Sequence, residues 1–272
     1  MLMKYSFIIL SVLFLIAACT QIEPEVPPDL QGDEHGTEVL VVEPEEAMNA
    51  EWVTYGDNFK DYLVKPLGEG RFPAVIMIHE WWGLNQNIKN MAHELAGQGY
   101  VVLAVDLFDG KVAETPEEAR GYSSKARNNM DRTLWHLKSA VSFLRESDFV
   151  SKDNIASMGW CFGGGMSLQL SLNEDLAATV IYYGNLETNE SKLSNINWPV
   201  LGVFGEEDTG IPVSSVNEFD AALDDLGVEN EIYIYEGVGH AFANPSNPGH
   251  DPEKTEDAWK KTVAFLDRNL KK

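Results

Sequence analysis

A cysteine occupies the nucleophile position of a glycine-rich turn near the middle of the chain. The run Gly159-Trp160-Cys161-Phe162-Gly163 follows a short apolar stretch, 155–158, and precedes a run, 166–172, that suits a helix. This is the nucleophile-elbow pattern G-x-S-x-G with sulfur in place of oxygen. Small residues on both sides let such a sharp turn close, and the helix N-terminus beneath it favours a thiolate. Alone the motif is weak, because a structural cysteine buried in a glycine-rich turn is more common.

A thiol nucleophile needs a base, and the base needs a group that orients it. After an elbow, the expected order along the chain is an acid and then a histidine. Asp208 follows the apolar run Val200–Phe204, and His240 follows the run Glu231–Tyr235 in a glycine loop. Each is equally a solvated loop residue when taken alone. Because both follow strands that end at the same edge as the elbow, order and placement together favour a triad with Cys161.

The other histidines do not suggest a metal site. His79-Glu80-Trp81-Trp82-Gly83 begins like the zinc-protease motif H-E-x-x-H but lacks its second histidine. His93 and His136 fall within expected helices, where we expect structural roles, and His250 lies in a loop rich in Pro, Asn and Gly. No cluster has the spacing of metal ligands, so neither a metal nor a cofactor is expected.

The segments that would position these residues alternate between strands and helices. An entry hairpin is expected over Glu51–Tyr55 and Phe59–Val64, around a Gly-Asp-Asn turn. The alternation predicts the α/β class, with one mostly parallel sheet covered by helices on both faces. Further strands are expected at Ala74–His79, Val101–Val105 and Ala178–Tyr182, and helices at Asn85–Gln98, Thr115 to about Lys125, Asp131–Glu146 and Thr255–Leu270.

Residues 1–19 are expected to form a targeting signal rather than part of the fold. Lys4 precedes an apolar run, 7–18, that is too short for a comfortable membrane span and suits a signal sequence. The run ends Leu15-Ile16-Ala17-Ala18-Cys19, which resembles a lipobox, the bacterial signal whose cysteine is acylated. We therefore expect an extracytoplasmic protein anchored by lipid on Cys19. An ordinary secretion signal and an uncleaved anchor are the alternatives.

Residues 20–50 are expected to form an acidic tether, and residues 51–272 a single domain. The tether carries nine acids, four prolines and no Lys or Arg, so it cannot bury enough apolar surface to order itself. The whole chain has a net charge of −23. Without the signal, which contains Lys4, and without the nine acids of the tether, the domain has a net charge near −15. This charge argues against nucleic acid and anionic lipid as partners. We expect a monomer that acts on a small ester or lactone and contacts the membrane only through its lipid.

Four segments together resemble the dienelactone hydrolase (carboxymethylenebutenolidase) family. They are residues 79–85, the elbow 159–164, the loop 205–208 and the segment 240–242, and the resemblance extends over Glu51–Leu270. It implies the α/β-hydrolase fold, hydrolysis of carboxylic esters, and a triad of Cys161, His240 and Asp208. In that family the glutamate matched by Glu80 lies beside the thiol and helps to activate it. A buried carboxylate can accept a thiol proton when substrate arrives.

The resemblance also implies the groups that bind substrate. The oxyanion hole would be the backbone N–H groups of Phe162 and Trp81. The family holds its substrate carboxylate with two arginines, but Asn244 stands at one of these positions here. Arg120 is the best match for the other, and Arg127 is a weaker one.

The departure at Asn244 affects the expected substrate. A single arginine would bind an anionic lactone less tightly, and Trp81 and Trp82 would add an aromatic wall to the site. We therefore expect a hydrolase of lactones or small esters, with a neutral or bulkier substrate. A broader carboxylesterase or thioesterase remains open, as does a non-catalytic, membrane-tethered binding domain.

Overall fold

The computed structural model describes residues 49–271. The expected signal, Cys19 and all but the last two residues of the expected tether lie outside the described residues. Strand β1 (Asn49–Tyr55) already includes Asn49 and Ala50, which the sequence had assigned to the tether. The folded domain therefore begins at least two residues before its expected start at Glu51.

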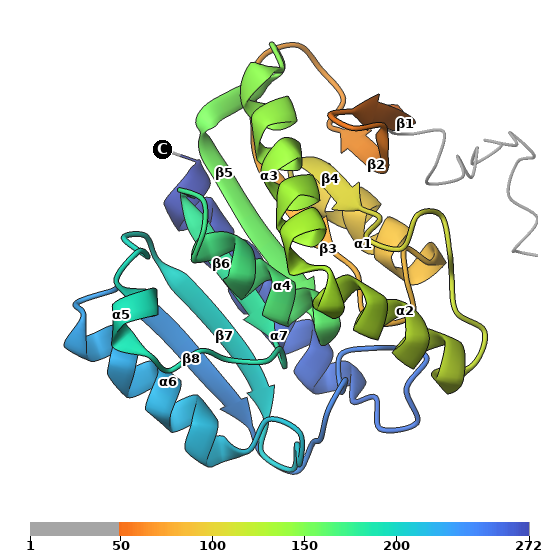
Figure 1. Ribbon diagram of the computed structural model, residues 1–272. Coiled ribbons are helices and arrows are strands. Elements are labelled where there is room, and N and C mark those ends of the chain that lie inside the picture. Colours follow the sequence, from red (N-terminus) through yellow and green to blue (C-terminus); the bar gives the residue numbers. More distant parts are fainter. Residues whose placement is uncertain (1–48, 272) are drawn as a thin grey trace, which may run out of the picture. The chain divides into compact units, whose positions relative to one another are not determined.

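One eight-stranded sheet forms the centre of the domain (Figure 1), in the order β1-β2-β4-β3-β5-β6-β7-β8. Strand β2 (Phe59–Lys65) pairs antiparallel with both β1 and β4 (Val101–Val105). All other neighbours pair parallel, so the predicted α/β class with a mostly parallel sheet is confirmed. The remaining strands are β3 (Phe72–Ile78), β5 (Val150–Trp160), β6 (Ala178–Tyr182), β7 (Val200–Gly205) and β8 (Asn230–Tyr235).

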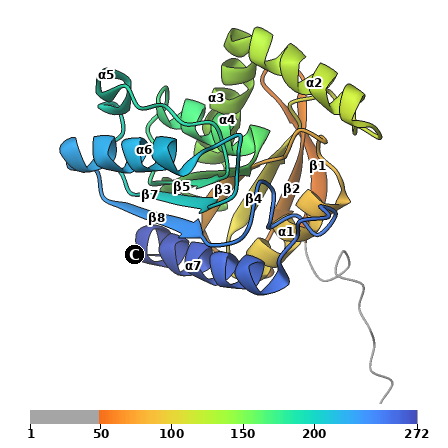
Figure 2. The ribbon, with the colours of Figure 1, turned by 90° about the horizontal axis from the view of Figure 1, so that it is seen from below.

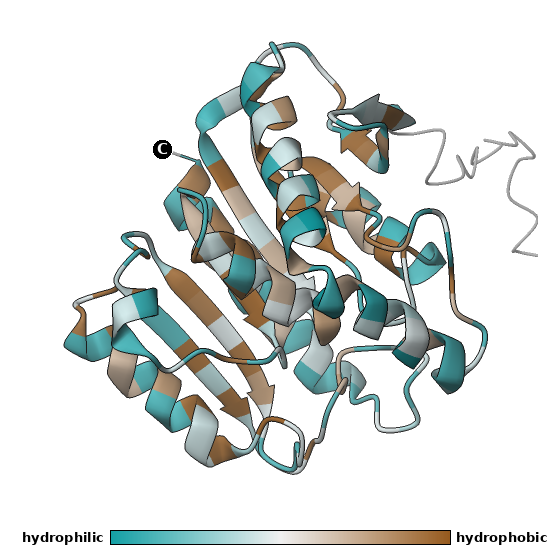
Figure 3. Ribbon diagram, viewed as in Figure 1, coloured by the Kyte–Doolittle hydropathy of each residue, from teal (hydrophilic) through white to brown (hydrophobic). Residues whose placement is uncertain are grey.

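Helices cover both faces of this sheet, as the alternation predicted (Figure 2). Two of them, α1 (Gln86–Gly97) and α7 (Pro252–Leu270), lie on one face. Strands β4, β6 and β7 are buried along their whole length, as parallel strands between two helical layers must be. Apolar residues accordingly concentrate in the strands (Figure 3). The other face carries α2 (Pro116–Asn128), α3 (Met130–Glu146), α4 (Phe162–Ser171), α5 (Glu190–Leu193) and α6 (Val213–Asp225).

Three of the described helices begin at a capping side chain. Asn85 caps α1 by accepting from the Ile88 N–H, and Thr115 caps α2, with proline in the first turn, as expected. Asp251 caps α7, which therefore begins at Pro252, three residues earlier than expected. Helix α4 begins directly after the elbow cysteine instead of at residue 166. The glycines that obscured this start in the sequence are needed there for close packing.

His93 and His136 lie within helices and have structural partners, as expected. His136 Nε2 lies 3.0 Å from Asp61 Oδ2, and both side chains are buried. Asp61 Oδ1 also accepts the Asp106 N–H at 2.8 Å. His93 Nε2 lies 2.9 Å from the Tyr62 hydroxyl. These contacts fasten the entry hairpin to α3, to the end of β4 and to α1.

The parallel strands set the position of the site. Because β3, β5, β6, β7 and β8 run in one direction, their carboxyl ends meet at one edge of the sheet. Polar and reactive side chains follow each of these ends within a few residues. They are Glu80 after β3, Cys161 after β5, Tyr183 after β6, Asp208 after β7 and His240 after β8.

Candidate active site

Cys161 lies in a strained turn between β5 and α4. Its φ of 54° and ψ of −115° place a non-glycine residue in a sparsely populated region, at a cost of about 1–3 kcal/mol. The Cys161 N–H donates to the Tyr182 carbonyl at 3.0 Å, which fixes the turn against the end of β6. The side chain is half-buried and stands at the N-terminus of α4, where a thiolate is favoured.

Glycines let the elbow approach the neighbouring strand ends. A Cβ at Gly163 would lie 2.2 Å from the Ile78 carbonyl oxygen and 2.5 Å from that of His79. A Cβ at Gly184 would lie 2.3 Å from the Gly165 nitrogen. Backbone therefore packs directly on backbone between α4 and the ends of β3 and β6. This contact brings the residues after β3, β5 and β6 together.

Asp208 and His240 form the hydrogen-bonded pair that the sequence predicted. His240 Nδ1 lies 2.6 Å from Asp208 Oδ2. Asp208 Oδ1 accepts the N–H groups of Gly210 at 2.8 Å and Ile211 at 3.1 Å. Burial opposes ionisation of Asp208, but the His240 contact and these N–H groups outweigh it and lower its pKa. The carboxylate is therefore held charged and in one orientation.

The surroundings of His240 favour its protonated form when Cys161 is a thiolate. Burial favours its neutral form, but hydrogen bonds with Asp208 and Cys161, and the charges of both, raise its pKa to about 10. Its side chain is 41 % exposed, whereas that of Asp208 is 1 % exposed. The imidazole thus lies between a buried carboxylate and the open cleft.

Glu80 is buried beside these groups with an unusual pKa. Burial raises the pKa of Glu80 to about 7, opposed by the charge of His240 and by hydrogen bonds from Asn244 and Tyr183. Asn244 Nδ2 donates to Glu80 Oε2. The position where the sequence departs from the family pattern therefore contacts the carboxylate expected to activate the thiol. A carboxyl group that titrates near pH 7 can exchange protons under ordinary conditions.

An open cleft of about 710 Å³ is lined by three of the predicted catalytic residues, Glu80, Cys161 and His240. Trp81 and Trp82 form one wall, edge to face at 5.2 Å between ring centroids. None of the residues described as lining this cleft is a lysine or arginine. The lining comprises Glu80, Trp81, Trp82, Asn85, Ala113, Cys161, His240, Ala241, Asn244, Ser246, Asn247 and Pro248.

The two arginines considered from the sequence do not line the cleft. Arg120 is exposed on α2, so the expectation that it anchors a substrate carboxylate is not supported by its position. The reason is that α2 begins at Pro116, beyond the segment that reaches the cleft at Ala113. Arg127 lies farther along α2, with its guanidinium 5.1 Å from the ring centroid of Phe162.

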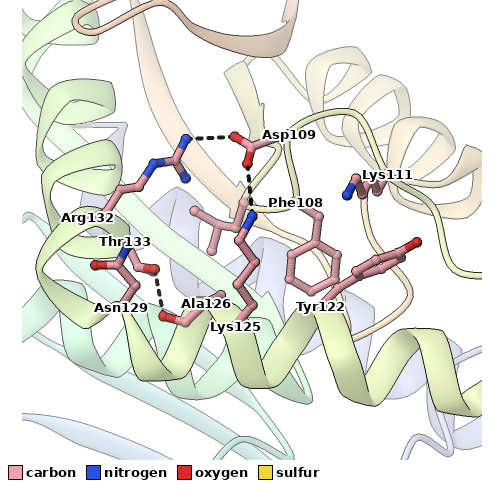
Figure 4. Close-up of a pocket in the computed structure, with 10 residues that line it drawn as sticks. Phe108, Asp109, Lys111, Tyr122, Lys125, Ala126, Asn129, Arg132 and Thr133 are labelled. Atoms are coloured by element: carbon pink, nitrogen blue, oxygen red, sulfur yellow. Dashed lines mark hydrogen bonds and ion pairs between the residues drawn. The ribbon is translucent and has the colours of Figure 1, made fainter.

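Cationic side chains gather instead around a separate cavity of about 180 Å³, shown in Figure 4. Lys111, Lys125 and Arg132 contribute to its lining, and Asp109 lies among them. Arg132 pairs with Asp109 at 2.7 Å, and Lys125 Nζ lies 3.9 Å from the same carboxylate. None of the predicted catalytic side chains lines this cavity.

Sequence reasoning missed two residues of the site. Tyr183 follows β6 at the same sheet edge, and its ring lies 5.2 Å from that of His240. Asn85 ends the segment 79–85 and was expected to start a helix, but was given no role in the site; it caps α1 and also lines the cleft. The strand end at Tyr182 was a usable signal for Tyr183, because β3, β5, β7 and β8 each end at this edge before a candidate residue.

Two further features are absent from residues 49–271. No group of three or more His, Cys, Asp or Glu side chains in this range could hold a metal ion. No helix in the same range is long and apolar enough to cross a membrane.

Comparison with known proteins gives concordant results. The model of the "Dienelactone hydrolase family" matches residues 59–270. "Protein usf" of Aquifex pyrophilus is 32% identical over 222 residues, 79% of this chain and 95% of the relative. A "Putative carboxymethylenebutenolidase" of Saccharolobus solfataricus is 30% identical over 247 residues, 78% of this chain and 95% of the relative.

Solved structures agree on the fold. The crystal structure of a "Putative Dienelactone Hydrolase" from Klebsiella pneumoniae matches with a TM-score of 0.73 and 24% identity. The match covers 81% of this chain and 98% of the other. At this identity the likeness shows the α/β-hydrolase fold, which agrees with the sheet and helix arrangement described above.

Proposed function

Because the chain belongs to the dienelactone hydrolase family and is a hydrolase of carboxylic ester bonds, we propose that it works through a Cys161–His240–Asp208 triad. One observation carries the proposal: His240, paired with Asp208 at 2.6 Å, lines the same cleft as the elbow cysteine. Glu80 takes part as the acceptor of the thiol proton. Phe162 and Trp81 supply the backbone N–H groups of the oxyanion hole.

Glu80, rather than His240, removes the thiol proton in this scheme. Beside the Cys161 thiolate and Asp208, with a pKa of about 10, His240 is protonated at pH 7 and serves as the counter-ion of the thiolate. Glu80, with a pKa of about 7, is partly ionised there and can accept one. The proton moves from Cys161 Sγ to the Glu80 carboxylate. The resulting thiolate is stabilised by the imidazolium and by the N-terminus of α4.

The remaining steps balance with one water molecule. The thiolate attacks the ester carbonyl carbon, and the oxyanion forms beside the Phe162 and Trp81 N–H groups. The C–O bond then breaks, and the His240 imidazolium gives its proton to the leaving oxygen. Water next attacks the acyl-thioester while neutral His240 takes one of its protons. The C–S bond breaks, the acid leaves, and Glu80 returns its proton to Cys161.

The cleft favours an uncharged substrate with an apolar or aromatic part. Its walls offer two indole rings and the carboxamide of Asn85, but no Lys or Arg side chain is among the residues described as lining it. The amide nitrogens of Asn244 and Asn247 already donate to Glu80 and to the carbonyls of His240 and Ala241. Carboxamides can bind the oxygens of a neutral lactone or ester, whereas a carboxylate would have to enter beside Glu80 in a strongly acidic protein. We therefore propose a neutral lactone or ester as the preferred substrate.

An acyl-enzyme experiment tests this function. The full-length protein is mixed with a p-nitrophenyl ester panel and a lactone panel, quenched, digested and analysed by mass spectrometry. We expect an acyl group on the peptide that contains Cys161, together with a burst of p-nitrophenol. Preference for lactones, oxoesters or thioesters separates a lactonase from a broader carboxylesterase or thioesterase. Binding without turnover or acylation would instead indicate a non-catalytic domain.

Substrate charge gives a second expected outcome. Wild-type kcat/KM should be at least about tenfold higher for a neutral ester than for a matched anionic one, because the residues described as lining the cleft include no Lys or Arg and the His240 imidazolium is engaged by Asp208 and Cys161. Asn244→Arg should narrow this ratio at least about fivefold, whereas Arg120→Ala should leave it unchanged. The ratio cancels any general loss of activity. A ratio that responds to Arg120→Ala instead would reinstate that residue as the anchor.

The pH profile of Glu80 variants gives a third expected outcome. Ionised Glu80 is the active form, so wild-type kcat/KM should rise with pH through about 7. Glu80→Gln should remove this rising limb and lower kcat/KM by about 10²-fold at pH 8. Glu94→Gln, at an exposed position on α1, is the control and should change neither. A persistent limb near pH 7 in Glu80→Gln would assign it to another group.

For the N-terminal segment we propose lipid anchoring on Cys19 at an extracytoplasmic membrane surface. The support is the sequence alone: an apolar run that ends in small residues before a cysteine, then an acidic segment. Labelling of cells with a palmitate analogue should mark the full-length protein but not a Cys19→Ala variant. Unlabelled protein in the medium would instead indicate simple secretion.

A further inference from the structure

Two buried polar atoms near the nucleophile lack a hydrogen bond of normal geometry within the described part of the chain. They are Glu80 Oε1 and the hydroxyl oxygen of Tyr183. Tyr183 is 1 % exposed and Glu80 is 4 % exposed, so bulk water does not reach them freely. An unsatisfied buried polar group costs about 1–3 kcal/mol. Two of them in neighbouring residues of one site therefore call for a functional explanation.

The backbone holds Tyr183 rigidly beneath the cleft. Its N–H donates to the Val203 carbonyl at 2.8 Å, and the preceding carbonyl accepts the Cys161 N–H. Its φ of 35° is positive, which is uncommon for a residue with a side chain. The tyrosine ring lies edge-on to His240 at 5.2 Å and to Phe242 at 5.9 Å. The side chain is thus fixed against both the nucleophile turn and the imidazole.

The hydroxyl faces groups that change charge during the reaction. Glu80, Cys161 and the neighbouring Tyr182 act on Tyr183, and its ring packs on His240. Burial, with the negative charges of Glu80 and Cys161, raises the pKa of Tyr183 well above its usual value. The phenol therefore stays protonated at working pH and can only share its proton as a hydrogen-bond donor. In turn, its hydrogen bond to Glu80 lowers the pKa of that carboxyl group.

We propose that Tyr183 is a positioning residue for thiol activation, whose hydroxyl holds the ionised Glu80 carboxylate toward Cys161. The inference rests on the proposed function. Before activation the O–H donates to the carboxylate. When the thiol proton has moved to Glu80, the same O–H is free to donate to the Cys161 thiolate. The phenol keeps its proton throughout. The same hydroxyl therefore donates to the negative charge on Glu80 before the proton transfer and to the negative charge on Cys161 after it.

The test compares Tyr183→Phe with Tyr182→Phe in the full-length protein. Tyr182 is the matched control, because it is equally buried but its hydroxyl bonds to Thr262 at 2.6 Å, on the side of α7. For Tyr183→Phe we expect the rising limb of kcat/KM to move up by about one pH unit, since the charged form of Glu80 loses a donor. Activity below the limb should then fall about tenfold. For Tyr182→Phe the limb should not move.

Two further readouts separate positioning from structure. Unfolding temperatures should differ from wild type by no more than about 5 °C for Tyr183→Phe, because only the one hydrogen bond to Glu80 is lost. The effect of Tyr183→Phe should also disappear in a Glu80→Gln background, as expected of residues that act through one another. An unmoved limb, or an equal loss in the Glu80→Gln background, would overturn the proposal.

Alkylation of Cys161 tests the role of Tyr183 independently of the proposed catalytic triad. The rate at which iodoacetamide labels the Cys161 peptide, measured by mass spectrometry from pH 5 to 9, reports thiolate formation without any turnover. Tyr183→Phe should shift this profile to higher pH, and Tyr182→Phe should not. If the profile fails to shift while turnover still requires Cys161, Tyr183 loses its assigned role and the triad stands. If turnover does not require Cys161, the triad itself fails.

Discussion

Replacement of Cys161 by alanine is expected to lower kcat/KM for p-nitrophenyl esters by about 10⁴-fold or more. Loss of a covalent nucleophile removes the acyl-enzyme route and leaves only binding and the oxyanion hole, which together supply a small residual rate. The measurement is a comparison of initial rates at pH 8 with an uncatalysed blank. The acylated Cys161 peptide and the p-nitrophenol burst should disappear with the activity.

Two controls make the Cys161→Ala result interpretable. Alanine at this position keeps a Cβ at the strained φ of 54°, so the unfolding temperature should change little. Cys161→Ser preserves the shape of the elbow but offers a hydroxyl, which a carboxylate with a pKa of about 7 cannot deprotonate effectively. It should therefore recover little of the lost rate. An alanine variant with a tenth of wild-type activity would rule out the thiol as nucleophile.

The sheet was predictable because its strands are short apolar runs that the chain separates with helices. Val101–Val105 and Ala178–Tyr182 were predicted with the bounds that the structure gives them, since uninterrupted apolar runs are typical of doubly covered parallel strands. The predicted boundaries of strands and helices were wrong where polar or small residues belong to the element. β5 begins at Val150, and its first part carries Ser, Lys, Asp and Asn, so only Ile155–Met158 stood out.

Helix α6 was absent from the specific sequence predictions for a related reason. It spans Val213–Asp225 and buries only one face, through Val216, Phe219, Ala222 and Leu223. Its first turn has no acidic residue, its last has no basic one, and no side chain caps it. With Pro212 at the cap position, little in the local sequence marks the start. Helix α6 is therefore stabilised by packing on the sheet rather than by capping.

The candidate site was predictable where topology decides the positions. Elbow, acid and histidine each follow a strand, and parallel strands bring their carboxyl ends together whatever the loops contain. Side chains that depend on loop and helix paths were not predictable in this way. Arg120 matched by sequence position, but the start of α2 carries it away from the cleft. The contact of Asn244 with Glu80 joins residues 164 positions apart, and no local pattern signals it.

Replacement of Asp208 by asparagine is expected to lower kcat/KM by about 10³- to 10⁴-fold without unfolding the protein. Oδ1 is held by the N–H groups of Gly210 and Ile211, so the new side chain will keep its oxygen there. Its NH₂ group must then occupy the Oδ2 position, 2.6 Å from His240 Nδ1 in the wild type. A donor at that point forces the imidazole proton onto Nε2, and it removes a charge that raises the pKa of His240.

The consequence for pH dependence has a definite sign. His240 is protonated at pH 7 in the wild type because its folded-state pKa is about 10. Without the Asp208 charge the pKa of His240 falls. The imidazolium that stabilises the thiolate is therefore lost at a lower pH in the variant than in the wild type. NMR titration of the His240 ring should record the fall directly. Glu207→Gln, at the exposed neighbouring position, should leave both the titration and kcat/KM unchanged. A normal His240 titration together with full activity in Asp208→Asn would mean that the buried carboxylate orients the loop and not the imidazole.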